Sequence, residues 1–166
     1  SDEYGLMTFH RPSNVDNKET LIELVSTIEN CSNHLTMVLP LHPRTKKSLI
    51  KHNLWNKFYG IKNFIITDSL GYLDFMKLVT NSKIVITDSG GIQEETTFLQ
   101  IPCITVRENT ERPITITMGN NELIQLDAGL IPKRMTEKLN DSYEGEIPPM
   151  WDGHATERIL RILSEE

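Results

Sequence analysis

The fold of this chain is decided by the stretch Ile84-Val85-Ile86-Thr87-Asp88-Ser89-Gly90-Gly91-Ile92-Gln93-Glu94-Glu95. Its β-branched start predicts a buried strand over Ile84–Thr87, followed by a polar turn and a helix. Gly90 and Gly91 let the backbone come close to a ligand, and the free amides at the start of the helix attract an anion, above all a phosphate. The stretch therefore predicts a strand–turn–helix unit with a phosphate-binding turn.

The same stretch allows a purely structural interpretation, because a serine and two glycines after a strand often make only a tight turn. Glu95 lies about one turn into the helix, where its carboxylate either accepts hydrogen bonds from two ribose hydroxyls or only stabilises the helix dipole. The sequence has neither the lysine of a P-loop nor the spaced glycines of a dinucleotide site. We favour a diphosphate and sugar site formed by Ser89, Gly90, Gly91 and Glu95.

Short β-branched runs alternate with helical patterns on both sides of this unit. The further strand candidates are Tyr4–Phe9, Thr36–Leu39, Phe64–Thr67, Cys103–Val106 and Glu122–Gln125. Apolar strands separated by helices predict a parallel sheet covered on both faces, which is a doubly wound α/β domain. We expect its ligand at the carboxyl ends of the strands, where loops meet helix N-termini.

Two of the predicted helices carry specific expectations. Apolar residues spaced by three and four predict an amphipathic helix that begins near Asn17, and Asp16, followed three residues on by Glu19, resembles its capping box. The last predicted helix, Ala155–Leu163, is amphipathic as well. We expect its apolar side to dock on another surface.

The composition limits the class of protein. A chain of 166 residues with 38% hydrophobic and 24% charged residues suits one packed domain. The formal net charge of −6 argues against a nucleic-acid partner, because no general positive field would hold a phosphate backbone. No apolar run approaches the roughly 18–20 residues of a membrane span, and the N-terminus lacks a secretory pattern. We therefore expect a cytoplasmic protein with no membrane partner.

The cysteines and the isolated histidines indicate no metal centre. Cys31 and Cys103 lie far apart in apolar segments, which predicts two buried thiols in a reducing compartment rather than a disulfide or a zinc site. His34, His52 and His154 form no spaced set with carboxylates. We expect neither a metal nor a cofactor.

A second polar cluster follows the first predicted strand. Pro12 ends the strand pairing, and His10 with Arg11 would project into the crevice of the glycines, offering a titratable imidazole beside a fixed cation. A histidine at a strand end caps the chain about as often as it contacts a ligand. The segment His42-Pro43-Arg44, after the second strand, would add positive charge to the same rim.

A third cluster follows the fifth predicted strand. Arg112 precedes Pro113 at a predicted helix start and is well placed to pair with a phosphate, unless Glu111 pairs with it in a surface bridge. Tyr72 and Phe75 open the helix after the third strand. The ring of Phe75 either lines a base pocket or, as is more common, packs in the core.

Six segments occur in the order and approximate spacing of the non-hydrolysing UDP-N-acetylglucosamine 2-epimerase family: HRPSNVD, LHPRTK, GYLDFMKLV, TDSGGIQEE, IPCITVRENTERP and WDGHATERI. Over essentially its whole length the chain resembles the C-terminal half of such enzymes. The resemblance implies a glycosyltransferase-B arrangement of two Rossmann-like domains with the active site between them. Residues 1–166 would form the UDP-binding C-terminal domain, without its N-terminal counterpart.

The resemblance also implies roles for matching positions. His10 corresponds to an active-site histidine near the diphosphate and sugar, with Arg11 beside it as a substrate-binding residue, and Phe75 corresponds to a contact of the base region. The diphosphate turn corresponds to Ser89, Gly90 and Gly91. The ribose-binding acid corresponds to Glu95, and the arginine near the phosphates corresponds to Arg112.

The implied reaction interconverts UDP-N-acetylglucosamine and UDP-N-acetylmannosamine. The proton at carbon 2 is removed and UDP is eliminated to give a glycal, to which UDP is added back with inverted configuration. Helix amides, Arg112 and His10 would stabilise the departing diphosphate. The acids for the proton transfers come from the N-terminal domain in this family, so we expect the present chain to bind UDP weakly and to be inactive. The full-length enzyme is expected to be a homodimer.

Three positions depart from the family pattern. Pro12-Ser13-Asn14 lacks the acid of the usual HR-x-E-N, Ile114 replaces the acid after TERP, and Gly119-Asn120-Asn121 differs from the usual Gly-Thr. The exact sugar does not follow from these residues. The alternatives are an epimerase for a related UDP-sugar, either a uronic acid or a diacetamido derivative, a hydrolysing epimerase, and a non-catalytic nucleotide-sugar-binding module.

Overall fold

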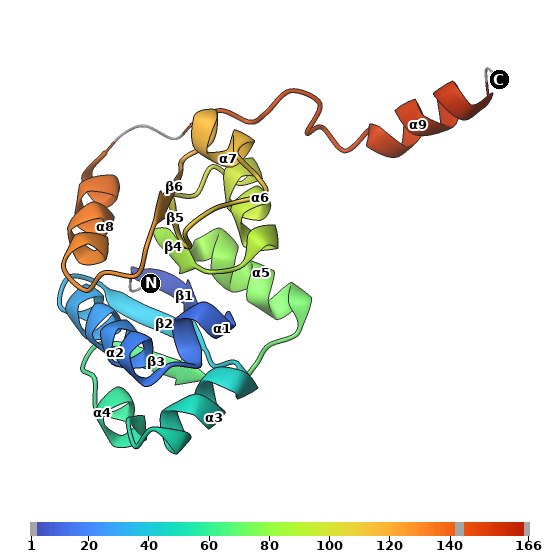
Figure 1. Ribbon diagram of the computed structural model, residues 1–166. Helices are drawn as coiled ribbons and strands as arrows, with labels where there is room; N and C mark the ends of the chain where they lie inside the picture. The colour runs from blue at the N-terminus through green and yellow to red at the C-terminus, as the bar shows by residue number, and fades with distance from the viewer. Residues whose placement is uncertain (1–2, 142–144, 165–166) are drawn as a thin grey trace.

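The strands form one parallel sheet in the computed structural model, which describes residues 3–141 and 145–164. In this part of the chain the sheet has six strands in the order β3-β2-β1-β4-β5-β6 (Figure 1). They are β1 (Tyr4–Thr8), β2 (Thr36–Pro40), β3 (Phe64–Thr67), β4 (Ile84–Thr87), β5 (Cys103–Val106) and β6 (Asn121–Ile124). All the predicted strands are present, with boundaries that differ by no more than one residue, and the doubly wound α/β fold is confirmed.

Helices cover both faces of this sheet (Figure 1). They are α1 (Pro12–Val15), α2 (Lys18–Ser32), α3 (Pro43–Lys51), α4 (Trp55–Tyr59), α5 (Tyr72–Asn81), α6 (Gly90–Phe98), α7 (Ile114–Thr117), α8 (Leu130–Asn140) and α9 (Ala155–Ser164). The larger core lies under α2, α3, α4 and α8, and the smaller core lies under α5 and α6. Alternate residues of one strand supply the two cores, as Met7 and Leu6 of β1 do, because successive side chains point to opposite faces.

The order of the strands creates a switch point between β1 and β4. These two strands are hydrogen-bonded neighbours, with Thr8 opposite Thr87 at their carboxyl ends. The chain proceeds from β1 toward β2 on one side and from β4 toward β5 on the other. The loops therefore diverge at this place, the switch-point crevice at which open α/β sheets bind their ligands.

The start of α2 corrects one sequence prediction. The helix begins at Lys18, close to the expected place, but its N-cap is Asn17, whose Oδ1 accepts a hydrogen bond from the Glu19 amide at 2.7 Å. Asp16 does not cap the helix, because its carboxylate accepts two hydrogen bonds from Arg44 of α3. A tertiary ion pair thus replaces the predicted local bond.

Helix α9 differs from the other long helices because none of its residues is buried. Figure 1 shows it projecting from the body of the domain on an extended segment. Ile159 is 56% exposed and Leu163 is 65% exposed. The apolar side that the sequence predicts to dock is therefore left uncovered by the described part of the chain.

Candidate functional site

Asp88 is the centre of the polar cluster at the switch point. It directly follows β4, and its side chain is fully buried. Its Oδ2 accepts hydrogen bonds from the backbone amides of His10 at 3.0 Å and of Arg11 at 2.8 Å. Because two loops from distant parts of the sequence meet on one carboxylate, Asp88 fixes the backbone of the His10–Arg11 segment against the glycine turn.

The side chains of His10 and Arg11 also contact Asp88. Nδ1 of His10 lies 3.1 Å from Oδ1 of Asp88, and the Nε of Arg11 donates to the Asp88 carbonyl oxygen at 2.9 Å. Asn14, which is buried, donates from Nδ2 to Asp88 at 3.2 Å and to the Val106 carbonyl oxygen at 3.1 Å. The departure at Pro12-Ser13 therefore leaves the asparagine of the family pattern in a structural position that ties β1, β4 and β5 together.

The glycine turn opens toward solvent at the start of α6. Ser89 is the N-cap residue, and its amide donates to Oγ1 of Thr87 at 3.0 Å. Apart from its chain neighbours and the backbone of its own helix, a Cβ atom added to Gly91 would have no heavy atom within 4 Å, and one added to Gly90 would have only Nη1 of Arg107, at 3.8 Å. Open space thus lies over the first amides of the helix, so an anion has room to approach them.

Glu95 lies one turn further along α6 and has an aromatic partner. The hydroxyl of Tyr72, at the first position of α5, donates to Oε1 of Glu95 at 3.1 Å. This hydrogen bond to the carboxylate raises the pKa of Tyr72. One oxygen of the Glu95 carboxylate is held in this way.

Phe75, predicted to contact a base, lies on the inner side of α5. It is partly buried and packs against the smaller core, which includes Leu6 and Val85. The structure therefore gives this ring a packing role, and any contact with a base involves only the part of the ring that stays exposed.

Arg112 pairs with α6 rather than with its neighbour in sequence. Its Nε lies 2.8 Å from Oε2 of Glu94, and this carboxylate raises the pKa of the Arg112 guanidinium. Glu111, which the sequence offered as the partner of Arg112, instead forms a two-bond pair with Arg107 at 2.9 Å that lowers the pKa of Glu111 to about 2.

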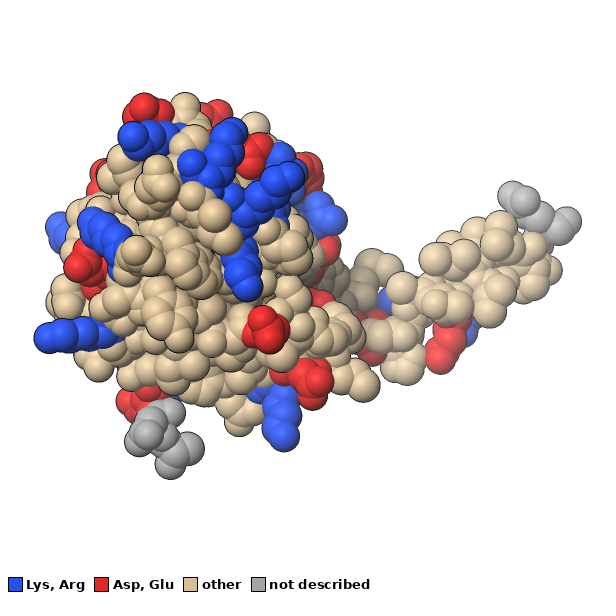
Figure 2. Space-filling model, turned by 90° about the horizontal axis from the view of Figure 1, so that it is seen from below, with Lys and Arg blue, Asp and Glu red and all other residues tan. Residues whose placement is uncertain are grey.

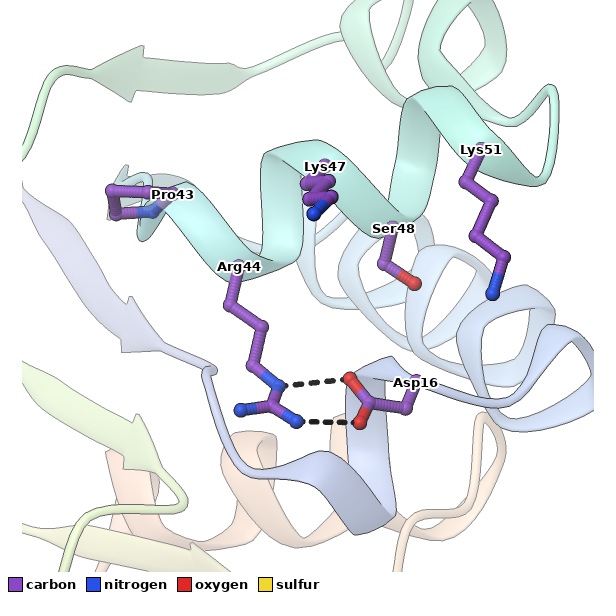
Figure 3. Close-up of a pocket in the computed structure, with 6 residues that line it drawn as sticks. All are labelled: Asp16, Pro43, Arg44, Lys47, Ser48 and Lys51. Carbon is purple, nitrogen blue, oxygen red and sulfur yellow. Dashed lines mark hydrogen bonds and ion pairs between the residues drawn. The ribbon is translucent and has the colours of Figure 1, made fainter.

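The segment His42-Pro43-Arg44 divides between the crevice and a neighbouring groove. The ring of His42 lies 5.3 Å from that of His10, centroid to centroid. Arg44 instead faces Asp16 across a groove between α3 and the turn before α2, as Figure 3 shows. The groove measures about 510 Å³ and is lined by Asp16, Pro43, Arg44, Lys47, Ser48 and Lys51. His42 is therefore the member of the segment that reaches the predicted rim.

One stretch of the chain carries positive charge without any acidic residue. Residues 30–67 contain no aspartate or glutamate and six cationic residues, which are Arg44, Lys46, Lys47, Lys51, Lys57 and Lys62. Figure 2 shows lysine and arginine side chains gathered on one part of the face seen from below. The net charge of −6 thus conceals a local basic region on and around α3, next to the crevice.

Cys31 and Cys103 are unpaired and buried, as predicted, and burial raises the pKa of Cys31 to about 12 and that of Cys103 to about 11. Within residues 3–141 and 145–164, no three His, Cys, Asp or Glu side chains come together in a way that suits a metal ion. In the same part of the chain, no helix combines the length and the apolar character required to cross a bilayer.

The comparison with protein families matches residues 1–164 to the family described as UDP-N-acetylglucosamine 2-epimerase. The chain belongs to this family. A UDP-N-acetylglucosamine 2-epimerase of Methanocaldococcus jannaschii is 41% identical over 165 residues, which are 98% of this chain and 45% of that protein. A UDP-2,3-diacetamido-2,3-dideoxy-D-glucuronate 2-epimerase of Pseudomonas aeruginosa is 31% identical over 99% of this chain and 45% of its own length.

Solved structures agree with this family assignment. The Methanocaldococcus jannaschii 2-epimerase, crystallised in complex with UDP-GlcNAc and UDP, matches 99% of this chain and 46% of its own chain, with 40% identity and a TM-score of 0.90. The structure of an Escherichia coli heptosyltransferase with ADP, at 18% identity and a TM-score of 0.56, shares the fold alone. The chain thus spans about half the length of the curated 2-epimerase relatives that it matches.

The structure brings the predicted residues of this 2-epimerase family chain to one end of the sheet. His10, Arg11 and the turn Ser89–Gly91 meet around Asp88, and α6 carries Glu95 and the partner of Arg112. Sequence reasoning missed Asp88 and Glu94 as parts of the candidate site, and it named Tyr72 only as an aromatic residue at the start of a helix, not as the partner of Glu95. All three residues lie within the motifs TDSGGIQEE and GYLDFMKLV. The motifs do not show which side chains these residues contact, and only the fold does.

Proposed function

We propose that this chain is the UDP-binding, C-terminal half of a UDP-N-acetylglucosamine 2-epimerase. One observation carries the proposal: the open glycine turn at the start of α6 lies at the β1–β4 switch point, next to His10 and Arg11. Such a position offers free amides and two adjacent basic side chains to a diphosphate. The Methanocaldococcus jannaschii relative, crystallised with UDP-GlcNAc and UDP, supports the same ligand class.

The diphosphate would be held from three sides. The amides of Gly90 and Gly91 face it from the helix start, and Arg11 is fixed beside them by Asp88. Arg112 pairs with Glu94 through Nε, so the forked end of its guanidinium is the part that would meet a phosphate. In the elimination of UDP, these groups would stabilise the negative charge that develops on the departing diphosphate, with His10 beside it.

The uridine would extend along α6. Glu95 would accept hydrogen bonds from the ribose hydroxyls, with Tyr72 holding its other oxygen. The exposed part of Phe75 would contact the base.

The proton transfers at carbon 2 would be performed by acids of an N-terminal domain in the full-length protein. The chain spans about half the length of its 2-epimerase relatives, and the uncovered apolar side of α9 offers a surface for such a domain. We extend the proposal to a homodimeric, cytoplasmic enzyme; the unpaired, buried thiols of Cys31 and Cys103 support a reducing compartment.

Calorimetric titration of the 166-residue chain with UDP tests the binding half of the proposal. We expect weak, millimolar binding, and Glu95→Ala should weaken it by about tenfold or more, because hydrogen bonds to a charged group are the strong ones. Glu157→Ala, on the exposed face of α9, is the matched control and should leave the affinity unchanged. Absence of heat with UDP, together with no effect of Glu95→Ala, would sink the proposal.

Activity is tested separately. The isolated chain should not interconvert UDP-N-acetylglucosamine and UDP-N-acetylmannosamine, whereas the full-length protein should. Epimerisation by the isolated chain at the full-length rate would show that the reacting acids lie in these residues.

A related UDP-sugar is the second candidate substrate. The 31% identity to the Pseudomonas aeruginosa enzyme, named for a diacetamido uronic acid, favours it. Product analysis of the full-length protein with both UDP-sugars decides between them. Release of free N-acetylmannosamine would indicate a hydrolysing enzyme, and turnover of no UDP-sugar would indicate a non-catalytic binding module.

A further inference from the structure

Gln93 joins the two anion-binding elements of the site through one buried side chain. It lies on α6, and it has no exposed surface. Its Oε1 accepts a hydrogen bond from the hydroxyl of Thr110 at 2.6 Å, and its Nε2 donates to the carbonyl oxygen of Ser89 at 3.4 Å. One end of the amide therefore contacts the glycine turn, and the other end contacts the loop that carries Arg112.

The contact of Gln93 with Ser89 affects the direction of the Gly90 N–H, the first amide of the turn. A peptide group is planar, so the direction of the Ser89 carbonyl sets the direction of the Gly90 N–H on the opposite side of the same peptide. This N–H is one of the helix amides without an intrahelical partner. By holding the carbonyl from inside the domain, Gln93 aims the amide outward, where the diphosphate would lie.

The contact of Gln93 with Thr110 affects the position of the Arg112 backbone. The Thr110 hydroxyl that donates to Gln93 also accepts a hydrogen bond from the Arg112 amide at 3.0 Å. On the other side, the carbonyl oxygen of Arg112 accepts from the hydroxyl of Thr115 at 2.8 Å. The backbone of Arg112 is thus held at both its N–H and its C=O group.

The buried side chain of Asn121 closes this network. Its Nδ2 donates to Oγ1 of Thr115 at 3.0 Å and lies 3.4 Å from Oε1 of Gln93. Its Oδ1 accepts from the hydroxyl of Thr105 on β5 at 2.7 Å. Asn121 belongs to a segment that departs from the usual family pattern, and here it anchors the network to the sheet.

The neighbours of Gln93 point elsewhere. Glu94 pairs with the side chain of Arg112, and Glu95 accepts a hydrogen bond from Tyr72.

A completely buried amide is costly to desolvate, and an apolar side chain of similar size would fill the same space without that cost. The two ends of the Gln93 amide, however, match one acceptor and one donor on separate ligand-binding elements, and no apolar side chain can provide this connection.

We propose that Gln93 is a positioning residue, which sets the spacing between the helix amides at Gly90 and the guanidinium of Arg112 to suit a diphosphate. The inference rests on the proposed function, because it deepens the account of the same site. Gln93 itself would not touch the ligand. It would act through Ser89 and Thr110.

The test compares UDP with uridine in the 166-residue chain, with binding followed by NMR chemical-shift titration at millimolar ligand. Uridine engages only the ribose and base contacts, at Glu95 and Phe75, which Gln93 does not hold. Gln93→Leu should therefore weaken UDP by about tenfold, the factor that corresponds to one or two lost hydrogen bonds, and leave uridine within about twofold. A merely structural role would weaken both ligands alike.

Thr110→Val provides a second route, because it removes the linking hydroxyl from a partly exposed loop and puts less strain on folding than a change in the core. If the two residues act through one connection, the double variant should bind UDP no more weakly than Gln93→Leu alone. Thr96→Val is the matched control: it removes an equally buried hydroxyl of α6 that bonds carbonyl oxygens within the helix, and it should bind UDP normally.

The outcomes separate the inference from the proposed function. If the unchanged chain shows no response to UDP, the proposed function fails and the inference fails with it. If the unchanged chain binds UDP and both Gln93→Leu and Thr110→Val bind it equally well, the inference alone is overturned. Equal losses for UDP and uridine, or full additivity in the double variant, would overturn it as well.

Discussion

Nδ1 of His10 lies 3.1 Å from Oδ1 of Asp88, a carboxylate with no exposed surface. The two residues are far apart in sequence and meet because β1 and β4 are neighbours in the sheet. A carboxylate at one ring nitrogen fixes the orientation of the imidazole and leaves the other nitrogen for the crevice. The same carboxylate accepts the backbone amides of His10 and Arg11, so the side chain and its loop are set by one group.

Asp88→Asn should lower the free energy of unfolding by about 2–3 kcal/mol, because the new amide would present a donor where backbone N–H groups already donate. Urea denaturation measures the change. Asp74→Asn, on the exposed surface of α5, is the control and should change stability by less than about 0.5 kcal/mol. Equal stability of the two variants would contradict the anchoring role of Asp88.

Tyr72→Phe should weaken UDP binding by about threefold to tenfold, because the Glu95 carboxylate loses the hydrogen bond that holds it. Calorimetric titration with UDP measures the change. Tyr59→Phe is the control, since Tyr59 is also exposed but lies on α4. In a Glu95→Ala background Tyr72→Phe should have no further effect; a full additional loss there would mean that Tyr72 meets the ligand directly.

His42 should make the fold less stable in mild acid. Burial, followed by the nearby His10, lowers the pKa of His42, while Asp88 opposes the shift and Arg44 adds to it. The unfolded chain therefore takes up a proton at higher pH than the folded chain, and stability falls as the pH drops below about 6.5. Protonation also removes the acceptor of the helix cap, since Nδ1 of His42 accepts from the Arg44 amide at 3.1 Å.

The variant His42→Asn keeps a good N-cap side chain without a titrating ring. Its free energy of unfolding, measured in urea between about pH 7 and about pH 5.5, should change less with pH than that of the unchanged chain. An identical slope for both proteins would show that His42 does not cause the acid sensitivity.

Helix α9 should promote self-association of the 166-residue chain. Ile159, Leu160, Ile162 and Leu163 are all more than half exposed, and a contiguous apolar face of this kind favours contact with another surface. Light scattering should show a mass that rises with concentration, and Ile159→Glu should abolish the rise. Arg161→Gln, on the same helix, should not. Self-association through α9 would be ruled out if the unchanged chain is a strict monomer and Ile159→Glu does not change its solubility.

Local patterns in the sequence predicted the secondary structure well. Runs of β-branched residues such as Ile84–Thr87 became strands at the expected places, because side-chain periodicity is a property of the segment itself. The same holds for the glycine turn and for the helix that follows it. The N-cap of α2 shows where local patterns fail, because both Asp16 and Asn17 have side chains that can cap a helix. Arg44 on another helix binds the carboxylate of Asp16, and Asn17 is therefore the cap.

The sequence by itself determined the strands and helices and the motif at the start of α6, which depend on residues close together along the chain. It also determined the family, through motifs that lie along the whole chain. Only the tertiary structure decided the partner of each charged or polar group. Asp88 contacts His10, Arg112 pairs with Glu94, and Gln93 joins two loops. The physical reason is that such contacts act over a few ångströms, and the strand order β3-β2-β1-β4-β5-β6 sets which loops come within that range.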